Sequence, residues 1–252
     1  MREPEAEGNI QRELTLNRTV EEICEVLTAS FPEGAPTDTA VRSQGSDYFP
    51  QHWTSRWPAH LPLPAALHSS ELRRYIDRSG LFALAEETSS SEDILNLYVS
   101  ICAWGTGTQA QRVARVVKPL HEEGALDSLQ RSFTAARTLD PIEAYRRLNT
   151  TGEDRIKGFG PAFFTKWLYF AAYNDPTRTQ QPRPLILDER VSNALGWPPL
   201  SGRRPSSDYA QYLDTATKIN SAWAPSSPSH TIEYALFQIG KTTTKTPETT
   251  AQ

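Results

Sequence analysis

Two ionisable side chains of this sequence stand in strongly apolar surroundings, where a charge has chemical consequences. Lys166 is the single charged residue of the run FFTKWLYF, and Asp188 follows the apolar residues of PLILDERV. Burial of a lysine favours its uncharged amine, which is a nucleophile. A carboxylate can stabilise a developing positive charge or activate an attacking group. The alternatives are that Lys166 reaches solvent or binds a phosphate, and that Asp188 only caps the helix predicted for ERVSNAL.

A glycine-containing turn lies a few residues before Lys166. In the stretch RIKGFGP, Gly158 and Gly160 flank Phe159, and Pro161 follows. Glycine tolerates a positive φ and lets another molecule approach the backbone, and proline suits the first position of a helix. The free N–H groups of the turn and the positive end of the helix would then face the same way, which suits a phosphate. Taken alone, the tripeptide is explained more simply by a plain turn between two helices.

The net charge of −4 argues against a nucleic-acid partner, but the charge is unevenly distributed. Residues 1–30 contain three Arg against seven Glu, whereas residues 141–204 contain ten Lys or Arg against six Asp or Glu. A basic region in the second half, balanced by an acidic head, weakens the objection. A glycine turn that binds one DNA strand through its backbone N–H groups also needs few positively charged side chains.

The composition excludes several classes of protein. With 38% hydrophobic residues, 22% charged residues and a mean hydropathy of −0.54, it is typical of a soluble globular chain. No apolar run approaches the roughly 20 residues of a membrane span, and the polar start MREPEAEGNIQREL is unlike a secretory signal. We therefore expect a cytoplasmic protein with no membrane partner.

Metal chemistry is not expected either. Cys24 and Cys102 lie in apolar helical patterns and are predicted to be small buried residues, and the five histidines show no paired ligand spacing. We expect no metal and no cofactor, apart from a structural monovalent cation that the hairpin could hold.

The elements that must position these groups are predicted to be mainly helical. A capping box of Thr19 and Glu22, and the order Asp140, Pro141 at another start, mark two helices clearly. Helices are expected at about 19–30, 69–78, 91–104, 108–120, 126–138, 140–148, 161–174, 189–195, 206–222 and 230–240, with a short segment near 153–157.

Three features divide the chain. Residues 31–64 show no helical period and are interpreted as a long ordered loop wrapped on the body. Gly80 is expected to end the helix that Ser69 caps, and the Gly-Thr-Gly at 105–107 to break the next one. We therefore divide the chain into an acidic helix with a Pro- and aromatic-rich loop (1–64), a helical body (65–241) whose hairpin lies at 155–175, and a disordered tail (242–252).

The combination of GFGP, the apolar helix after it and PLILDERV resembles the helix–hairpin–helix DNA glycosylase superfamily, whose catalytic aspartate lies in such a run. PLILDERV looks especially close to the adenine-specific mismatch glycosylases. AWGTG at 103–107 and IEYALFQIGK at 232–241 resemble a bacterial group with an 8-oxoguanine-glycosylase-like fold. The specific match covers about 155–196, and the match at the level of the fold covers about 65–241. The resemblance implies a mainly α fold with two helical lobes and a cleft between them.

The resemblance also implies site residues. Asp188 takes the place of the catalytic carboxylate. The residues expected to bind DNA are Lys157, Gly158, Phe159, Gly160 and Ala162. Bifunctional members add a lysine that attacks C1′ of the sugar, two positions after the second hairpin glycine, where this chain has Ala162. Lys166, one turn further along the same helix face, is the candidate nucleophile, and strand cleavage stays open.

Excision requires that the base leaves the duplex, and aromatic side chains stabilise an extruded base by stacking. Trp104, Phe163 and Trp167 are the candidates for the base pocket, with a place in the core as the alternative for each.

The expected partner of a monomeric enzyme is double-stranded DNA with a modified base. Two substrate classes fit the resemblance: an oxidised purine, in repair, and a bulky modified cytosine such as glucosylated hydroxymethylcytosine of phage DNA, in antiviral defence. The rival from another class is a non-catalytic DNA-binding module that uses the same hairpin.

Overall fold

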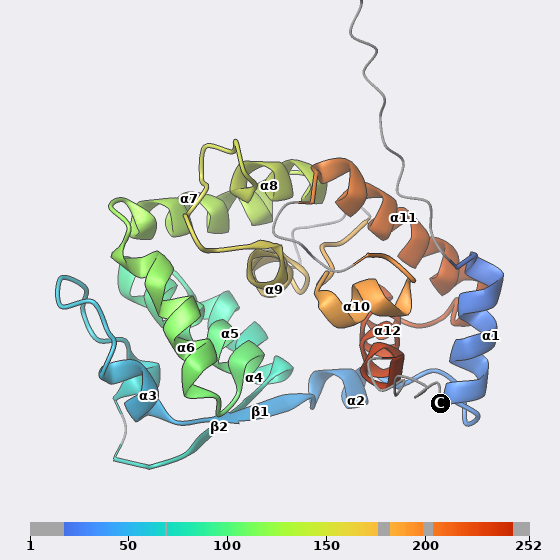
Figure 1. Cartoon of the computed structure of the whole chain (residues 1–252), viewed down its shortest axis with the longest axis horizontal. Coiled ribbons are helices and arrows are strands. Elements are labelled where there is room, and N and C mark those ends of the chain that lie inside the picture. Colours follow the sequence, from blue (N-terminus) through green and yellow to red (C-terminus); the bar gives the residue numbers. More distant parts are fainter. Residues whose placement is uncertain (1–17, 69, 176–181, 199–203, 244–252) are drawn as a thin grey trace, which may run out of the picture.

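The computed structural model describes residues 18–68, 70–175, 182–198 and 204–243, and most of them are helical (Figure 1). The helices are α1 (Val20–Ser30), α2 (Asp38–Arg42), α3 (Pro50–Thr54), α4 (Arg78–Glu87), α5 (Ser91–Thr106), α6 (Ala110–Val117), α7 (Ala125–Thr138), α8 (Pro141–Leu148), α9 (Pro161–Ala172), α10 (Glu189–Ala194), α11 (Ser206–Trp223) and α12 (Ser229–Thr243). Two 3₁₀ turns, η1 (Ala65–Leu67) and η2 (Lys118–His121), and two strands, β1 (Gly45–Tyr48) and β2 (Arg74–Asp77), complete the described part. The prediction of a mainly α protein is confirmed.

Helix α9 lies at the centre of the molecule and is seen end-on in Figure 1. It packs against α4, α5, α7 and α8. On the other side, α10 packs against α12, and α11 packs against α1 and α12. The two groups of helices flank α9, which carries the apolar run around Lys166. None of the helices in the described ranges is both long and apolar enough to span a bilayer.

Local capping signals place the helix starts well. The Thr19 and Glu22 capping box is present at α1, and Asp140 caps α8 with Pro141 at its first position. The cap of α5 is Ser90, which forms a capping box with Asp93, one residue before the predicted helix start at 91. Helix α5 also continues through Gly105, so the predicted break falls only at Gly107, where φ is +61°.

The region between α1 and α5 differs most from the sequence prediction. The expected loop 31–64 contains α2, β1 and α3, and β1 pairs in antiparallel register with β2, Gly45 lying opposite Asp77. The predicted helix 69–78 is wrong, because its second half is strand β2. Gly80 does not end a helix but donates its N–H to the Asp77 carboxylate, the cap of α4, at 2.8 Å. Ser69 lies outside the described residues.

The division into an N-terminal segment, a helical body and a tail stays a prediction. Within the first segment, α1 packs against α11 and α12 of the body. Helix α12 extends to Thr243, and residues 244–252 of the expected tail lie outside the described residues.

A chain of polar groups, buried except for its Asp38 end, joins α2, α4, α9 and α12. The His230 Nε2 donates to the Asp38 carboxylate at 2.6 Å, so its Nδ1 accepts from the Tyr169 hydroxyl at 2.9 Å. The Tyr169 hydroxyl in turn accepts from the Arg78 guanidinium at 2.9 Å. Burial, with a smaller contribution from the charge of Arg78, lowers the pKa of His230 to about 4, although the hydrogen bond to Asp38 opposes the shift. The imidazole is therefore neutral at pH 7.

This neutral histidine makes the fold sensitive to acid. The unfolded chain takes up a proton on His230 below a pH of about 6.5, whereas the folded protein does so only near its pKa of about 4. The contribution of His230 to stability is therefore complete above pH 6.5 and is lost as the pH falls towards 4. The loss is on the order of 3 kcal/mol.

We predict that the free energy of unfolding of the wild type, measured by urea denaturation between pH 7 and pH 4.5, falls more steeply than that of His230→Gln. The variant is less stable at pH 7 but lacks the titrating group. Parallel curves for the two proteins would contradict the assignment.

Candidate active site

The hairpin that precedes α9 is a tight turn with a buried central ring. Gly158 has a φ of +87°, which an L side chain rarely adopts. The Phe159 N–H donates to the Ile156 carbonyl at 3.1 Å, and the Phe159 ring is buried against Tyr98 and Phe164. Gly160 caps α9, and its carbonyl accepts from the N–H groups of residues 163 and 164. The hairpin backbone is thus fixed before any ligand binds.

The segment between α8 and the hairpin, which includes the short segment predicted near 153–157, contains turns and no helix. Asp154 is fully buried there, and its carboxylate accepts from Arg131 and Arg147, each at 2.7 Å. This pair of arginines fixes the loop to α7 and α8. The side chain of Lys157 is exposed, with its Nζ 4.0 Å from the Glu122 carboxylate.

The extended segment before α10 is held by three hydroxyl groups. The Tyr209 hydroxyl accepts from the Leu185 N–H at 3.2 Å and donates to the Leu185 carbonyl at 2.9 Å. The Tyr212 hydroxyl donates to the carbonyl of residue 186 at 2.8 Å, and the Thr165 hydroxyl of α9 accepts from the N–H of residue 187 at 3.1 Å. Because this segment is buried, its polar backbone groups need such partners. The result is a fixed position for the next residue, Asp188.

Asp188 and Lys166 form an ion pair, although they are 22 residues apart in the chain. The Lys166 Nζ donates to Asp188 Oδ2 at 3.0 Å, and their side chains are only 8% and 15% exposed. Asp188 Oδ1 accepts from the N–H groups of Arg190 and Val191 at 3.1 and 3.3 Å, as the cap of α10. The structure therefore brings together the two ionisable groups that the sequence singles out, and both are used structurally as well.

The local environment keeps Asp188 ionised. Burial raises the pKa of its carboxyl, but the charge and hydrogen bond of Lys166, together with the two backbone N–H groups, lower it more. The net pKa lies below the usual value for an aspartate. A carboxylate at this position is charged at neutral pH and can stabilise a cation that develops next to it.

The Lys166 amine lies one helical turn back from its own Cα. Side chains on a helix point towards its N-terminus, and the Lys166 Nζ donates to the Ala162 carbonyl at 2.8 Å. The amine is thus brought to the level of Ala162, the position at which the resemblance expects a lysine. Phe163 lies beside it, with the Lys166 Nζ 5.7 Å from the centre of the ring.

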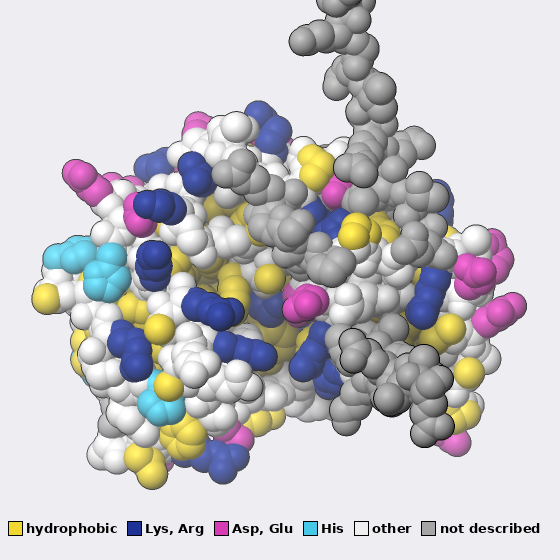
Figure 2. Space-filling model, viewed as in Figure 1, with side chains coloured by type: hydrophobic (Ala, Val, Ile, Leu, Met, Phe, Trp, Pro, Cys, Tyr) yellow, Lys and Arg dark blue, Asp and Glu magenta, His cyan; other side chains and the backbone are white. Residues whose placement is uncertain are grey.

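A cleft of about 650 Å³ opens onto this pair. It is lined by the start of β1, the end of α5, and parts of α6, α9, α10 and α12. Figure 2 shows a hollow in the centre of this face with hydrophobic side chains in its depth and several Lys and Arg side chains around it. The cleft therefore lies between the two groups of helices that flank α9.

Only two of the three aromatic candidates for the base pocket lie at the cleft. Phe163 and Trp104 line the cleft, and the Trp104 indole N–H donates to the Gln44 carbonyl at 2.9 Å. Trp167 does not line it. Its ring is fully buried between Tyr98 and Phe133, so its assignment to the base pocket is wrong. The reason is helical geometry: on α9, residues 163 and 166 share the cleft side, and residue 167 turns towards α5 and α7.

The sequence reasoning missed several residues of the cleft. Besides Lys166, the basic side chains that line it are Arg112, Arg115, Arg190 and Lys241. None of these four is among the DNA-binding residues expected from the sequence. Gln44 and Ser46 were also missed, because the region around β1 was interpreted as loop. The high Arg content of α6 was the one available signal, but the fold was needed to show which face it borders.

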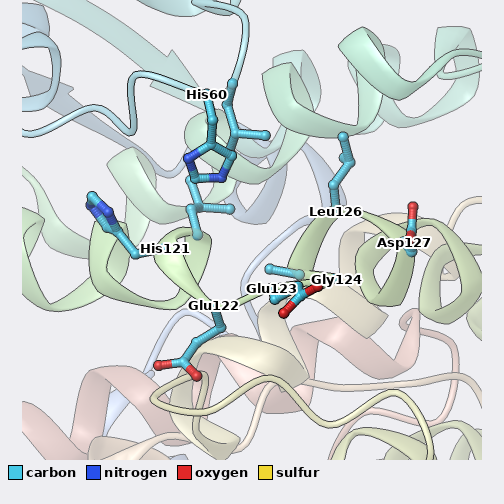
Figure 3. Close-up of a pocket in the computed structure, with 10 residues that line it drawn as sticks. His60, His121, Glu122, Glu123, Gly124, Leu126 and Asp127 are labelled. Carbon is cyan, nitrogen blue, oxygen red and sulfur yellow. The ribbon is translucent and has the colours of Figure 1, made fainter.

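A smaller pocket of about 410 Å³ lies elsewhere, at the junction of η2 and α7. Figure 3 shows His60 over this pocket, while His121 and Glu122 point in different directions. Within the described ranges, no group of three or more His, Cys, Asp or Glu side chains is arranged to hold a metal ion. No chemistry is assigned to this pocket.

The position of α10, and with it Asp188, depends on a close contact with α12. A Cβ at Gly240 would overlap the backbone carbonyl of Arg190, whereas a Cβ at Gly80 would make ordinary contacts of 3.5 Å or more. Both glycines lie inside helices. On helix propensity alone, alanine would stabilise either site by about 0.5–1 kcal/mol.

We predict opposite effects for the two substitutions. Gly80→Ala raises the unfolding midpoint slightly, whereas Gly240→Ala destabilises the protein by about 1–3 kcal/mol through overpacking. Thermal or urea denaturation of both variants checks this. An increase in stability for Gly240→Ala would show that α10 and α12 are not in the contact described.

Comparison with known proteins gives the family. A family model described as "Putative 8-oxoguanine DNA glycosylase OGG-like protein" matches residues 39–237, a range that contains the hairpin, Lys166 and Asp188. No curated protein and no solved structure matches the chain. Because the family match covers well over half of the chain, it confirms the resemblance that the sequence motifs indicate. The chain therefore belongs to the OGG-like family of DNA glycosylases.

Proposed function

We propose that the protein extrudes a modified base from double-stranded DNA and cleaves its N-glycosidic bond, which leaves an abasic site. One observation carries the proposal: Lys166 and Asp188 form a partly buried pair, 3.0 Å apart, in a cleft beside the glycine hairpin. Cleavage of a glycosidic bond develops positive charge on C1′, and a fixed, ionised carboxylate stabilises that charge. Asp188 fills this role.

The surroundings of the pair support binding of DNA. The Phe159 N–H is used inside the turn, so Gly158, Gly160 and Ala162 are the residues whose N–H groups are offered to a phosphate. The basic side chains of α6, α10 and α12 around the cleft would contact phosphates nearby. An extruded base would enter the cleft between these charges and lie against Phe163 and Trp104. Affinity for DNA thus comes from one face, in spite of the negative net charge.

Lys166 is the proposed nucleophile of a bifunctional enzyme. Its amine lies next to the Ala162 carbonyl, so a longer reach along the helix compensates for the shifted sequence position. Once deprotonated, the amine attacks C1′, the bond to the base breaks and the base leaves with the bonding electrons. The covalent intermediate then becomes a Schiff base, which permits strand cleavage.

For the substrate we propose a hypermodified cytosine, such as glucosylated hydroxymethylcytosine of phage DNA, excised in antiviral defence. A cleft of about 650 Å³ has room for more than a planar base, since sites of roughly 300–1,000 Å³ accept drug-sized ligands. The second candidate is an oxidised purine of the 8-oxoguanine type, excised in repair. The description of the family favours this alternative.

We predict that the protein releases bases from phage DNA containing glucosylated cytosines and not from unmodified phage DNA, as measured by counting abasic sites. Release only from an 8-oxoguanine duplex would assign the second substrate. The variant Asp188→Asn should lower release by at least about 100-fold and leave the DNA dissociation constant nearly unchanged, because asparagine still caps α10. Normal release by Asp188→Asn would contradict the mechanism. DNA binding without any release by the wild type would favour a non-catalytic binding module.

We further predict that borohydride traps a covalent adduct between the wild type and its substrate DNA, visible on a denaturing gel. Lys166→Gln should lose the adduct, while Lys218→Gln, on the exposed side of α11 and away from the cleft, should keep it. Absence of an adduct in the wild type would mean that water is the nucleophile and that the enzyme is monofunctional.

A further inference from the structure

Gln44 occupies one wall of the cleft, and hydrogen bonds from Trp104 and Arg78 hold its backbone there. It lies in the link between α2 and β1, and it lines the same cleft as Lys166 and Asp188. Its main-chain carbonyl accepts from the Trp104 indole at 2.9 Å and from the Arg78 N–H at 3.2 Å. These two bonds fix the backbone of Gln44 against α4 and α5.

The Gln44 side chain is fixed as well. Its Oε1 accepts from Arg78 Nε at 2.9 Å. The Arg78 side chain is fully buried and is itself held by the Glu233 carboxylate at 2.6 Å and the Tyr169 hydroxyl at 2.9 Å. Its guanidinium lies 5.2 Å from the ring of Trp104, which also lines the cleft. An arginine so confined cannot turn away from the glutamine.

This contact determines the orientation of the carboxamide. A guanidinium has only donors, so the atom of Gln44 that faces Arg78 must be the oxygen. The Nε2 amino group is then the branch that faces away from the buried arginine. Within the described part of the chain, no hydrogen-bond acceptor contacts this Nε2, and the residue is only half-buried. Gln44, a residue that lines the cleft, thus has its Oε1 acceptor used by Arg78 and, among the described residues, its Nε2 donor unused.

We propose that Gln44 determines base specificity by donating a hydrogen bond from Nε2 to an acceptor atom of the extruded base. The inference rests on the proposed function of the cleft. Because Oε1 is occupied by Arg78, Gln44 cannot rotate its amide to accept from a base that offers a donor instead. The site thus selects bases with a carbonyl oxygen or an unprotonated ring nitrogen at that edge. Arg78 and Glu233 act as positioning residues behind it.

A purely structural role for Gln44 makes a different prediction. If its only task were to satisfy Arg78, glutamate would serve equally well, since it offers an acceptor oxygen and a compensating charge. Gln44→Glu keeps the contact with Arg78 but replaces the donor of the cleft by an acceptor. Ser46→Ala is the matched control, because Ser46 lies on the same wall and its hydroxyl donates only to the Asp47 carbonyl, at 3.4 Å.

The test uses binding without turnover, in the Asp188→Asn background. The probes are short duplexes with a single thymine, or its nonpolar isostere difluorotoluene, opposite an abasic-site analogue that eases extrusion. The ratio of the two dissociation constants isolates the contact with the base, because changes in the attraction of phosphates affect both duplexes equally. We expect the parent and Ser46→Ala to bind the thymine duplex about 10- to 100-fold more tightly than the isostere duplex.

Gln44→Glu should reduce this ratio to near one while keeping the unfolding midpoint of its parent. A ratio that persists in Gln44→Glu, or that is near one already in the parent, would overturn the inference. The proposed function is tested separately by base release in the wild type, which can succeed or fail whatever the ratio. Loss of the ratio together with a lower midpoint would show a structural role and would also contradict the proposal.

Discussion

The ion pair between Lys166 and Asp188 is the interaction on which the rest of the site depends. Removing two charges from water is costly, and their mutual attraction offsets the cost only where further hydrogen bonds satisfy both groups. Here the Ala162 carbonyl and two backbone N–H groups of α10 provide them. The packing of α9, the extended segment before α10 and the contact of α10 with α12 all serve to keep these partners in place.

A second buried pair, between Arg78 and Glu233, lies behind the first. The pKa of Glu233 is raised, mainly by burial and partly by the negative charge of Asp188, while Arg78 and Lys166 oppose the shift. The two ion pairs contain two positive and two negative side chains, so together they place little net charge in the interior. Arg78 also donates to the Tyr169 hydroxyl, which is hydrogen-bonded to His230. This chain of hydrogen bonds connects the floor of the cleft to α2 and α12. Acid that protonates His230 would disturb this chain at its far end.

In the proposed function, the hairpin is the element that allows an acidic chain to bind DNA. Backbone N–H groups in a fixed turn bind a phosphate without side-chain charge, and the buried Phe159 ring and the buried Asp154 hold that turn rigid. Arg112, Arg115, Arg190 and Lys241 also line the cleft, next to Lys166. Local charge and fixed backbone dipoles therefore count for more here than the net charge of −4.

The sequence by itself determined the features that depend on near neighbours: the caps of α1 and α8, the turn at Gly158 and the role of Asp188 as a cap. Such signals involve groups within three or four residues, so they can be read locally. Only the tertiary structure decided that β1 pairs with β2, that Lys166 meets Asp188 and that Trp167 belongs to the core. Strand pairing and the direction of a buried side chain are set by partners far along the chain, and a four-residue strand has no local signal strong enough to replace them.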